Sequence, residues 1–272
     1  MKRLLIISPY FPPSNAADMQ RIRMSLPYFR EFGWEAEVVT VDPKHSDLNK
    51  DPLLHLSVDG ATSIHYVGAF AKKWTSKLGL GSIALRSLLF YKMKVNRILR
   101  TRRFDLIYFS TTQFPICVLG SYWKKKFGVP YVIHMQDPWH SNLYKNKPKE
   151  EQPAKYWFTY RLHKYLEPLA MNNVHGIISV SASYIEQLKG RYPNIREVPC
   201  KVLTFGYYEK DFDIAKKHAS EITLAYQCEA GKTNLVYIGR GGFDMAPAAT
   251  ILFEAYAIFL KKMPELAKDV RF

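Results

Sequence analysis

Short apolar runs alternate with segments of helical periodicity along most of this chain, and that alternation limits the fold more than any other feature. The first run, RLLIIS at residues 3–8, ends at Pro9. Comparable runs follow it at residues 37–41, 64–68, 105–110, 130–135 and 176–181. Continuously apolar strands joined by helices are typical of right-handed βαβ units and of a parallel sheet covered on both faces. Residues 1–212 are therefore predicted to form one Rossmann-like, doubly wound α/β domain.

Helical periodicity accompanies these strands. We expect helices at residues 20–32, 82–103, 115–127, 156–171 and 183–192. Gly33 and Gly128 directly follow the first and the third of them, where glycine is the favoured helix stop. Helices of this length can return the chain to the start of the next parallel strand.

The end of the chain begins a second pattern of the same kind. Residues 213–233 are polar and irregular, and we expect a linker there. An apolar run at 234–239, a Gly-rich turn and a helix at 246–262 then open a second Rossmann-like domain, residues 234–272. One βα unit cannot enclose a core, so this part either packs on the first domain or belongs to a truncated gene product. We favour truncation.

Composition narrows the class of protein. With 47% hydrophobic and 14% aromatic residues, the chain belongs among globular proteins. Its first apolar run is too short for the core of a signal peptide, and no stretch reaches the length of a membrane span. Three widely spaced cysteines argue against a disulfide framework and fit a cytoplasmic protein. The formal charge of +15 predicts an anionic partner: nucleic acid, nucleotide phosphates or an acidic membrane leaflet.

The loops after the strands are the candidate site, because ligands of an open parallel sheet bind where its strands end. These loops cover residues 9–18, 42–43, 110–113, 136–140 and 239–244. The first leads directly into a helix, whose free N-terminal amides and dipole suit an anion. Alternatively, its two prolines stiffen the loop and Asp18 caps the helix; both can hold at once.

The order of these segments resembles the N-terminal domain of retaining glycosyltransferase family 4. The resemblance rests on the YFPP loop within residues 4–41, FDLIYFSTTQFP at 104–115, GVPYVIHMQDPW at 128–139, GIISVS at 176–181 and FGYYEKDF at 205–212. The IGRGG turn at 238–242 is similar to the opening of that family's C-terminal domain. Each piece is weakly specific, whereas their order and spacing are jointly specific.

The resemblance implies a GT-B fold, in which two Rossmann-like domains face each other. It implies transfer of a sugar from a nucleotide-sugar, held by the second domain, to a glycan or lipid-linked acceptor held by the first. No metal or other cofactor is expected. It places Gly239 and Arg240 at the donor phosphates, where fixed positive charge replaces a metal. Alternatively, the glycines form only a tight βα turn.

Two departures from the family shift the expected contacts. Many members have a glycine pair where this chain has Ala16-Ala17, which narrows the pocket or moves donor contact to Ser14 and Asn15.

At the end of the fifth strand, Gln136 stands where many members carry a histidine, and Asp137 follows it. We place Gln136, Asp137 and Thr111 on the sugar and acceptor side; alternatively, Asp137 stabilises the turn before Pro138. The family's paired glutamates fall beyond residue 272, so no catalytic residue is assigned, and we expect little or no transferase activity from this chain.

Two sets of residues imitate metal sites. Residues 211–213 spell the DxD pattern of metal-dependent transferases, but they occupy the segment that ends the first domain. His134, Asp137 and His140 surround a strand end, where their side chains need not converge. We expect no metal at either place.

Cations crowd the expected helix at 82–103. Its apolar residues form a stripe on another side: Leu85, Leu88, Leu89, Val95, Ile98 and Leu99. This pattern suits contact with an anionic bilayer, and Lys72, Lys73, Lys77 and the run at 124–126 extend it. Alternatively, the stripe covers the sheet and the cations are simply solvated. No nucleic-acid-binding module is visible, so we expect no nucleic-acid partner. A non-catalytic binding module derived from a GT-B half is the other alternative to the enzyme.

Overall fold

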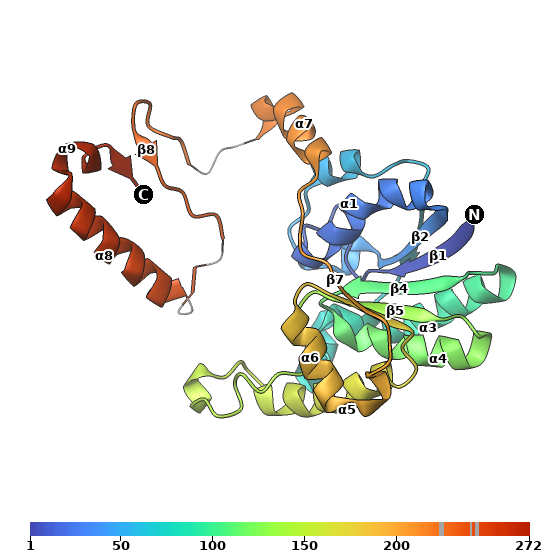
Figure 1. Ribbon diagram of the computed structural model, residues 1–272. Helices are drawn as coiled ribbons and strands as arrows, with labels where there is room; N and C mark the ends of the chain where they lie inside the picture. Colours follow the sequence, from blue (N-terminus) through green and yellow to red (C-terminus); the bar gives the residue numbers. More distant parts are fainter. Residues whose placement is uncertain (223–225, 240, 243–244) are drawn as a thin grey trace. The chain divides into compact units, whose positions relative to one another are not determined.

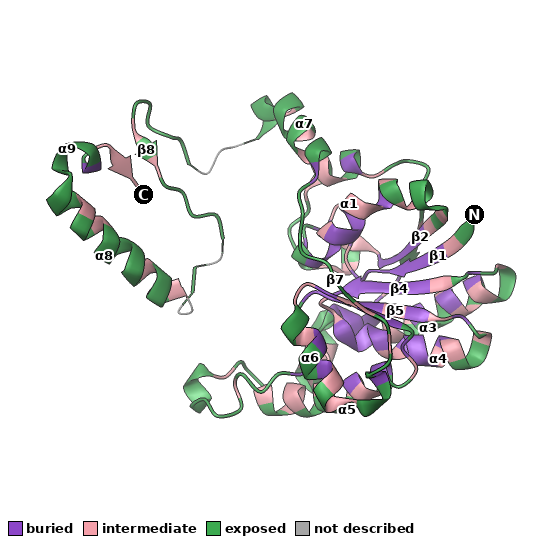
Figure 2. Cartoon of the chain, in the orientation of Figure 1, coloured by how far each residue is buried: buried purple, intermediate pink, exposed green. Residues whose placement is uncertain are grey.

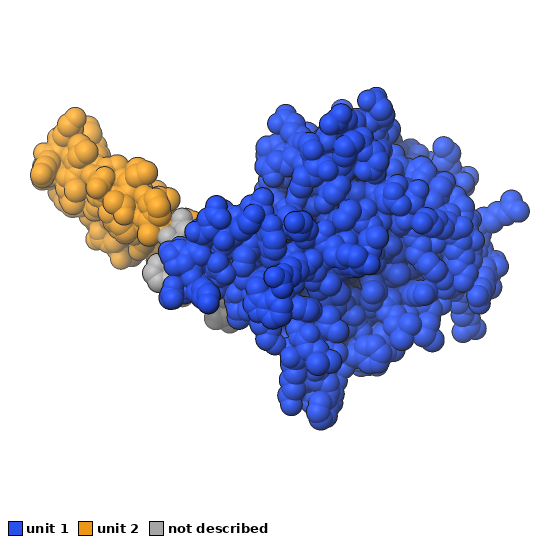
Figure 3. All heavy atoms as spheres, turned by 90° about the horizontal axis from the view of Figure 1, so that it is seen from below, with its two compact units in different colours: residues 1–217 blue, residues 218–272 orange. Residues whose placement is uncertain are grey.

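A computed structural model describes residues 1–222, 226–239, 241–242 and 245–272 (Figure 1). The chain forms two compact units, Met1–Lys217 and His218–Phe272, which Figure 3 colours separately. The predicted boundary at residue 212 falls inside a helix of the first unit, and the predicted division at 212 and 233 stays a prediction.

Unit 1 is built on a seven-stranded sheet in the order β3-β2-β1-β4-β5-β6-β7, with every neighbouring pair parallel. The strands are β1 (Lys2–Ile7), β2 (Trp34–Val41), β3 (Ser63–Val67), β4 (Leu106–Thr111), β5 (Tyr131–Met135), β6 (Gly176–Ser179) and β7 (Cys200–Val202). The order reverses between β1 and β4, so the carboxyl ends of these two strands form the switch point where such sheets bind ligands. The predicted doubly wound α/β class is confirmed.

Helices cover both faces of the sheet, with α1 on one side and α3, α4 and α5 on the other (Figure 1). Their bounds are α1 (Gln20–Phe29), α2 (Lys72–Thr75), α3 (Ile83–Thr101), α4 (Val118–Phe127), α5 (Tyr156–Met171), α6 (Ala182–Arg191) and α7 (Glu209–Lys217). All five expected helices form. Gly33 and Gly128 end their helices with φ near 75°, the left-handed conformation that glycine adopts without steric cost.

Two buried clusters lie on opposite faces of the sheet, as the alternation of side chains along each strand requires. Leu5 and Ile7 of β1 face the larger cluster, which contains residues of α3, α4, α5 and α6. Leu4 and Ile6 face the smaller cluster beneath α1. Figure 2 shows the central strands β1, β4 and β5 largely in the colour of buried residues, whereas the edge strands β3 and β7 are mostly not buried.

Of the apolar side chains expected to form a stripe on α3, Val95 and Ile98 are buried in this core, Leu88 and Leu99 pack against it half-buried, and Leu89 is 50% exposed. The same face of α3 buries Arg86, which donates hydrogen bonds to the carbonyls of Phe70 and His45. The alternative prediction, a helix that covers the sheet, therefore holds for most of the stripe, and Leu89 is the exception. No helix in the described part of the chain is long and apolar enough to cross a bilayer.

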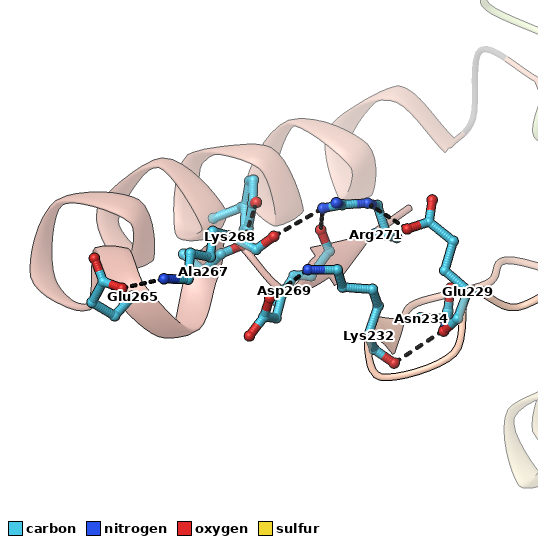
Figure 4. A network of polar contacts seen from close by, with 10 residues as sticks. Glu229, Lys232, Asn234, Glu265, Ala267, Lys268, Asp269 and Arg271 are labelled. Carbon is cyan, nitrogen blue, oxygen red and sulfur yellow. Dashed lines mark hydrogen bonds and ion pairs between the residues drawn. The ribbon is translucent and has the colours of Figure 1, made fainter.

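Unit 2 contains β8 (Thr233–Asn234), α8 (Ala246–Lys262), α9 (Pro264–Ala267) and β9 (Val270–Arg271), and the two short strands pair in parallel. Strand β8 has two residues, whereas the sequence predicted a strand over residues 234–239. Figure 4 shows the polar contacts around this pair, in which Lys232 binds Asp269 at 2.6 Å and Arg271 binds Glu229 at 3.3 Å. Ala267 alone is buried among the described residues of unit 2.

Candidate functional site

The carboxyl ends of β1, β4 and β5 meet at one edge of the sheet, and Asp18 is the residue that joins their loops. Its carboxylate, nearly fully buried, accepts hydrogen bonds from the hydroxyl of Thr111 at 2.7 Å and from the amide and hydroxyl of Thr112 at 3.0 and 3.2 Å. The side-chain amide of Gln136 donates to the backbone carbonyl of Asp18 at 2.8 Å. A buried carboxylate with three donors is a rigid structural junction.

Asp18 does not cap the helix that it precedes. The turn before α1 starts after Ala16 and has no side-chain cap, and the Asp18 carboxylate points instead to the loop after β4. The alternative in which Asp18 is a helix cap is therefore wrong. Sequence spacing held no signal for the true contact, because Asp18 and Thr111 are far apart along the chain.

Ser14 and Asn15 differ in access. Ser14 is buried and Asn15 is exposed. The backbone amides of Ser14, Asn15 and Ala16 donate to the carbonyls of Phe11, Asn49 and Ser14 at 2.8 to 3.1 Å, so a phosphate finds no free proton on them. These three amides are therefore not available to an anion, and Asn15 supplies the exposed polar side chain of this part of the loop.

A loop with two anchors follows β5. At one end, Gln136 is buried and also donates to the Ser110 hydroxyl at 3.2 Å. At the other end, the amide of His140 donates to buried Glu167 at 3.1 Å. Asp137 lies between the two anchors and is exposed to solvent. Partial desolvation and the nearby Asp18 raise the pKa of its carboxyl.

Glu167 is the second buried carboxylate of this region. It accepts hydrogen bonds from Tyr192 at 2.6 Å and lies 3.1 Å from the Arg191 guanidinium. Burial raises the pKa of Glu167, while Tyr192 and Arg191 oppose that rise. Because helix α5 supplies Glu167 and α6 supplies Arg191, these contacts fix the loop after β5 to two helices.

His134 lies in the core beneath the site. It is fully buried, and its Nδ1 lies 3.0 Å from the Tyr108 hydroxyl and 3.1 Å from the Ser110 hydroxyl. Burial and the nearby Arg21 lower the pKa of His134 to about 3, so the imidazole is neutral. His140 uses its Nδ1 toward Arg191 at 2.9 Å. Among the described residues, no three His, Cys, Asp or Glu side chains lie together as a metal site would require.

Two arginines of α1 hold the segment that follows β7. Arg21 donates to the carbonyls of Thr204 and Leu203 at 2.7 and 3.0 Å. Buried Arg23 binds both carboxylate oxygens of Asp211 at 2.5 and 2.6 Å. The first aspartate of the DxD pattern is thus the partner of an arginine and joins α7 to α1.

The predicted donor residues of unit 2 are only partly described. Gly239 is exposed, and Arg240 lies outside the described residues. Their contact with donor phosphates stays a prediction.

Comparison with known proteins places this arrangement in a family. The model of Glycosyltransferase Family 4 matches residues 26–204, more than half of the chain. Among solved structures, apo UGT2 of Phytolacca americana is similar at 12% identity and a TM-score of 0.51, over 89% of this chain and 58% of that one. HepE of Anabaena in complex with UDP is 17% identical with a TM-score of 0.47, over 100% of this chain and 68% of that one.

This chain covers 53% and 58% of the length of the first two matched structures, which are both of UGT2. No curated protein matches the sequence. The fold seen in unit 1, the likeness to UGT2 and the family match agree with the expected GT-B fold. This chain belongs to glycosyltransferase family 4.

Proposed function

We propose that the chain provides the acceptor side of a glycosyltransferase that moves a sugar from a nucleotide-sugar to a glycan or lipid-linked acceptor, in cell-surface polysaccharide or glycolipid synthesis. Membership of family 4 supports the transfer chemistry. The observation that carries the acceptor role is Asp137, an exposed carboxylate held between two buried anchors at the carboxyl edge of the sheet.

Asp137 is suited to binding sugar hydroxyls. A carboxylate accepts stronger hydrogen bonds than a neutral group, and a fixed loop loses little entropy on binding. Thr111 and Gln136 have another part in this proposal, because their side chains are already bonded to Asp18. They act as positioning residues that hold the loops on which the acceptor rests.

The donor side of the proposal assigns Gly239 and Arg240 to the phosphates, with Asn15 reaching toward the donor from the first loop. A leaving nucleoside diphosphate gains negative charge, and an arginine with backbone amides can stabilise it without a metal. Replacing Arg240 with Ala should weaken binding of a nucleotide-sugar such as UDP-glucose or GDP-mannose by roughly tenfold or more, since a charged hydrogen bond is lost. Titration calorimetry with both donors would measure this.

The acceptor role is tested by binding of neutral disaccharides. Saturation-transfer NMR with maltose, cellobiose and lactose should detect weak binding to the wild-type chain. Asp137→Ala should lower it by roughly tenfold to a hundredfold, because a hydrogen bond to a charged acceptor is lost. The matched control is Asp213→Ala, an exposed carboxylate in α7. Equal binding by wild type and Asp137→Ala would remove Asp137 from the acceptor site.

We also propose a peripheral location on the cytoplasmic face of a membrane. The net charge of +15 supports it, as do the exposed cations Lys92, Arg97 and Arg100 on the outer side of α3. Such cations are attracted to anionic lipids at short range.

A further inference from the structure

Three large apolar side chains are exposed on two neighbouring segments of unit 1. Trp74 of α2 is 63% exposed, Leu78 of the following 3₁₀ turn (Ser76–Leu78) is 72% exposed, and Trp157 at the start of α5 is 64% exposed. Side chains of this size are usually covered in a soluble domain, and when they gather at the surface they mark an interaction site.

The two segments are in direct contact. The Lys155 ammonium donates to the carbonyl of Ser76 at 2.8 Å. The ring of Phe158 packs over Gly79 so closely that a Cβ on this glycine would lie 2.7 Å from it. In the sequence, Trp157 lies between Lys155 and Phe158, and these two residues contact Ser76 and Gly79, on either side of Leu78. We call Trp74, Leu78 and Trp157 the apolar tip.

Exposed cations surround the apolar tip. The ammonium groups of Lys73 and Lys77 lie 5.6 and 5.3 Å from the Trp74 ring, and the Arg161 guanidinium lies 5.7 Å from the Trp157 ring. All three cations are exposed.

The chain around α2 and α3 contains no carboxylate of its own. Between Asp59 and Asp105 there is no Asp or Glu, whereas ten Lys and Arg residues occur. Within this stretch Lys72 is paired with Asp47, Arg102 with Glu37, and Arg86 is buried. Of the other seven cations, Lys73 and Lys77 lie against the Trp74 ring, and the remaining five follow along α3 and just after it.

Tryptophan, leucine and a ring of cations together fit the boundary of an anionic bilayer. Tryptophan prefers the headgroup level, leucine prefers the acyl region, and cations near the surface are attracted by anionic lipids. We propose that Trp74, Leu78 and Trp157 enter the headgroup region of an anionic bilayer while Lys73, Lys77 and Arg161 contact its headgroups. This inference rests on the proposed peripheral location and assigns it to other residues than the stripe of α3.

Vesicle sedimentation with the full chain tests the proposal. Wild type should bind vesicles of phosphatidylcholine with phosphatidylglycerol and bind pure phosphatidylcholine weakly. The triple variant Trp74→Ala, Leu78→Ala, Trp157→Ala should bind the anionic vesicles at least about tenfold more weakly, because apolar surface is no longer inserted. A matched control replaces Phe32, Leu143 and Tyr207, which are similarly exposed elsewhere, and should bind as wild type does.

Insertion itself can be read from tryptophan fluorescence. Brominated lipids should quench wild-type emission and quench the Trp74→Phe, Trp157→Phe variant much less, since Trp123 and Trp139 are buried and Trp34 is half-buried. Thermal unfolding of each variant, followed by circular dichroism, should match that of wild type because only exposed side chains change.

Three results would overturn the inference. If wild type binds and the tip variant binds equally well, the tip is not the docking surface and the peripheral location survives. If wild type does not bind anionic vesicles, both the tip and the location fail, while the disaccharide and donor titrations still decide the transferase proposal. Binding of a single-stranded oligonucleotide that requires Trp74, without vesicle binding, would assign the tip to nucleic acid instead.

Discussion

Helices α3 and α8 are similar in length, 19 and 17 residues, yet they lie in opposite environments. Seven residues of α3 are buried, and none of α8 is. Ile251, Phe253 and Ile258 of α8 are all more than half exposed. Figure 2 makes the contrast visible as purple turns in α3 and green turns in α8. Burial is set by the neighbouring sheet, because α3 covers strands of unit 1 and the described residues of unit 2 offer two strands of two residues.

The polar contacts of the two units differ in the same way. In unit 1, buried Arg23 and Glu167 are satisfied by partners from distant parts of the chain. In unit 2, the ion pairs of Lys232 and Arg271 lie at the surface, where solvent screening leaves such pairs little weight. Unit 1 therefore has both a core and fixed polar junctions, and we expect its cooperative unfolding to dominate any measurement of stability.

The largest expected difference between the units is in the loss of stability when one phenylalanine of each unit is replaced by alanine. Phe109 in β4 is fully buried and packs against Trp123 and Tyr131. Its ring centroid lies 6.0 and 6.1 Å from theirs. Phe109→Ala should lower the free energy of unfolding by about 3–5 kcal/mol, since it removes apolar contacts and leaves a cavity. Phe253→Ala in α8 should change it by less than about 0.5 kcal/mol, as is usual for exposed positions.

Urea denaturation of both variants, followed by tryptophan fluorescence, would measure this difference. The signal reports unit 1, because all five tryptophans lie there. If Phe253→Ala destabilised the protein as much as Phe109→Ala, α8 would have to be part of the same cooperative core.

The second effect is a pH dependence that comes from burial in unit 1. The folded pKa of His134 is about 3, below its ordinary 6.5, so acid adds a proton to the unfolded chain before the folded one. The contribution of neutral His134 to the free energy of unfolding is thus fully present above pH 6.5 and is lost progressively as the pH drops toward 3. Between pH 7 and pH 5 the loss should be about 2 kcal/mol. In unit 2, by contrast, His218 pairs with Glu221 at the surface.

Stability curves at pH 7 and pH 5 for wild type and His134→Gln would isolate this contribution. The variant is expected to start from a lower stability, because it loses the contacts with Tyr108 and Ser110, but to lose about 2 kcal/mol less between the two pH values. An equal loss in both proteins would assign the acid sensitivity to other groups.

The contrast between units also separates what sequence could predict from what it could not. Apolar runs predicted six of the seven strands of unit 1 because each spans at least four residues and is bounded by turns. Strand β7, Cys200–Val202, has three residues and sits at the sheet edge, so it carries no such signal. Helical period predicted the stripe on α3, but period alone does not say whether a sheet or a membrane covers it.

The sequence predicted which loops form the candidate site better than it predicted what each side chain does there. The rule that ligands bind at strand ends selected the loops carrying Thr111, Gln136 and Asp137. Which side chains remain open depends on contacts across the sheet, such as Thr111 with Asp18 and Gln136 with Asp18. Local sequence does not reveal such pairings. A helix cap was therefore one alternative for Asp18, which is instead the junction of three loops.

The smallest expected effect uses a matched pair of glycines. Gly33 in unit 1 and Gly231 in unit 2 have φ of 77° and 74°, and no atom lies within 4 Å of the place a Cβ would take at either one. Alanine therefore adds only the backbone cost of the left-handed conformation, about 1 kcal/mol. Gly33→Ala should lower the unfolding free energy of unit 1 by that amount, whereas Gly231→Ala should leave it unchanged.

Gly190→Ala is the control for the added methyl group, because this glycine lies inside α6 with equally open space around it. It should stabilise unit 1 by roughly 0.5–1 kcal/mol, since alanine favours the helix. The three variants together separate backbone strain from helix propensity, and unit 1 from unit 2. If Gly231→Ala shifted the tryptophan-detected transition as far as Gly33→Ala does, the two units would unfold together, and the independence inferred from their different burial would be wrong.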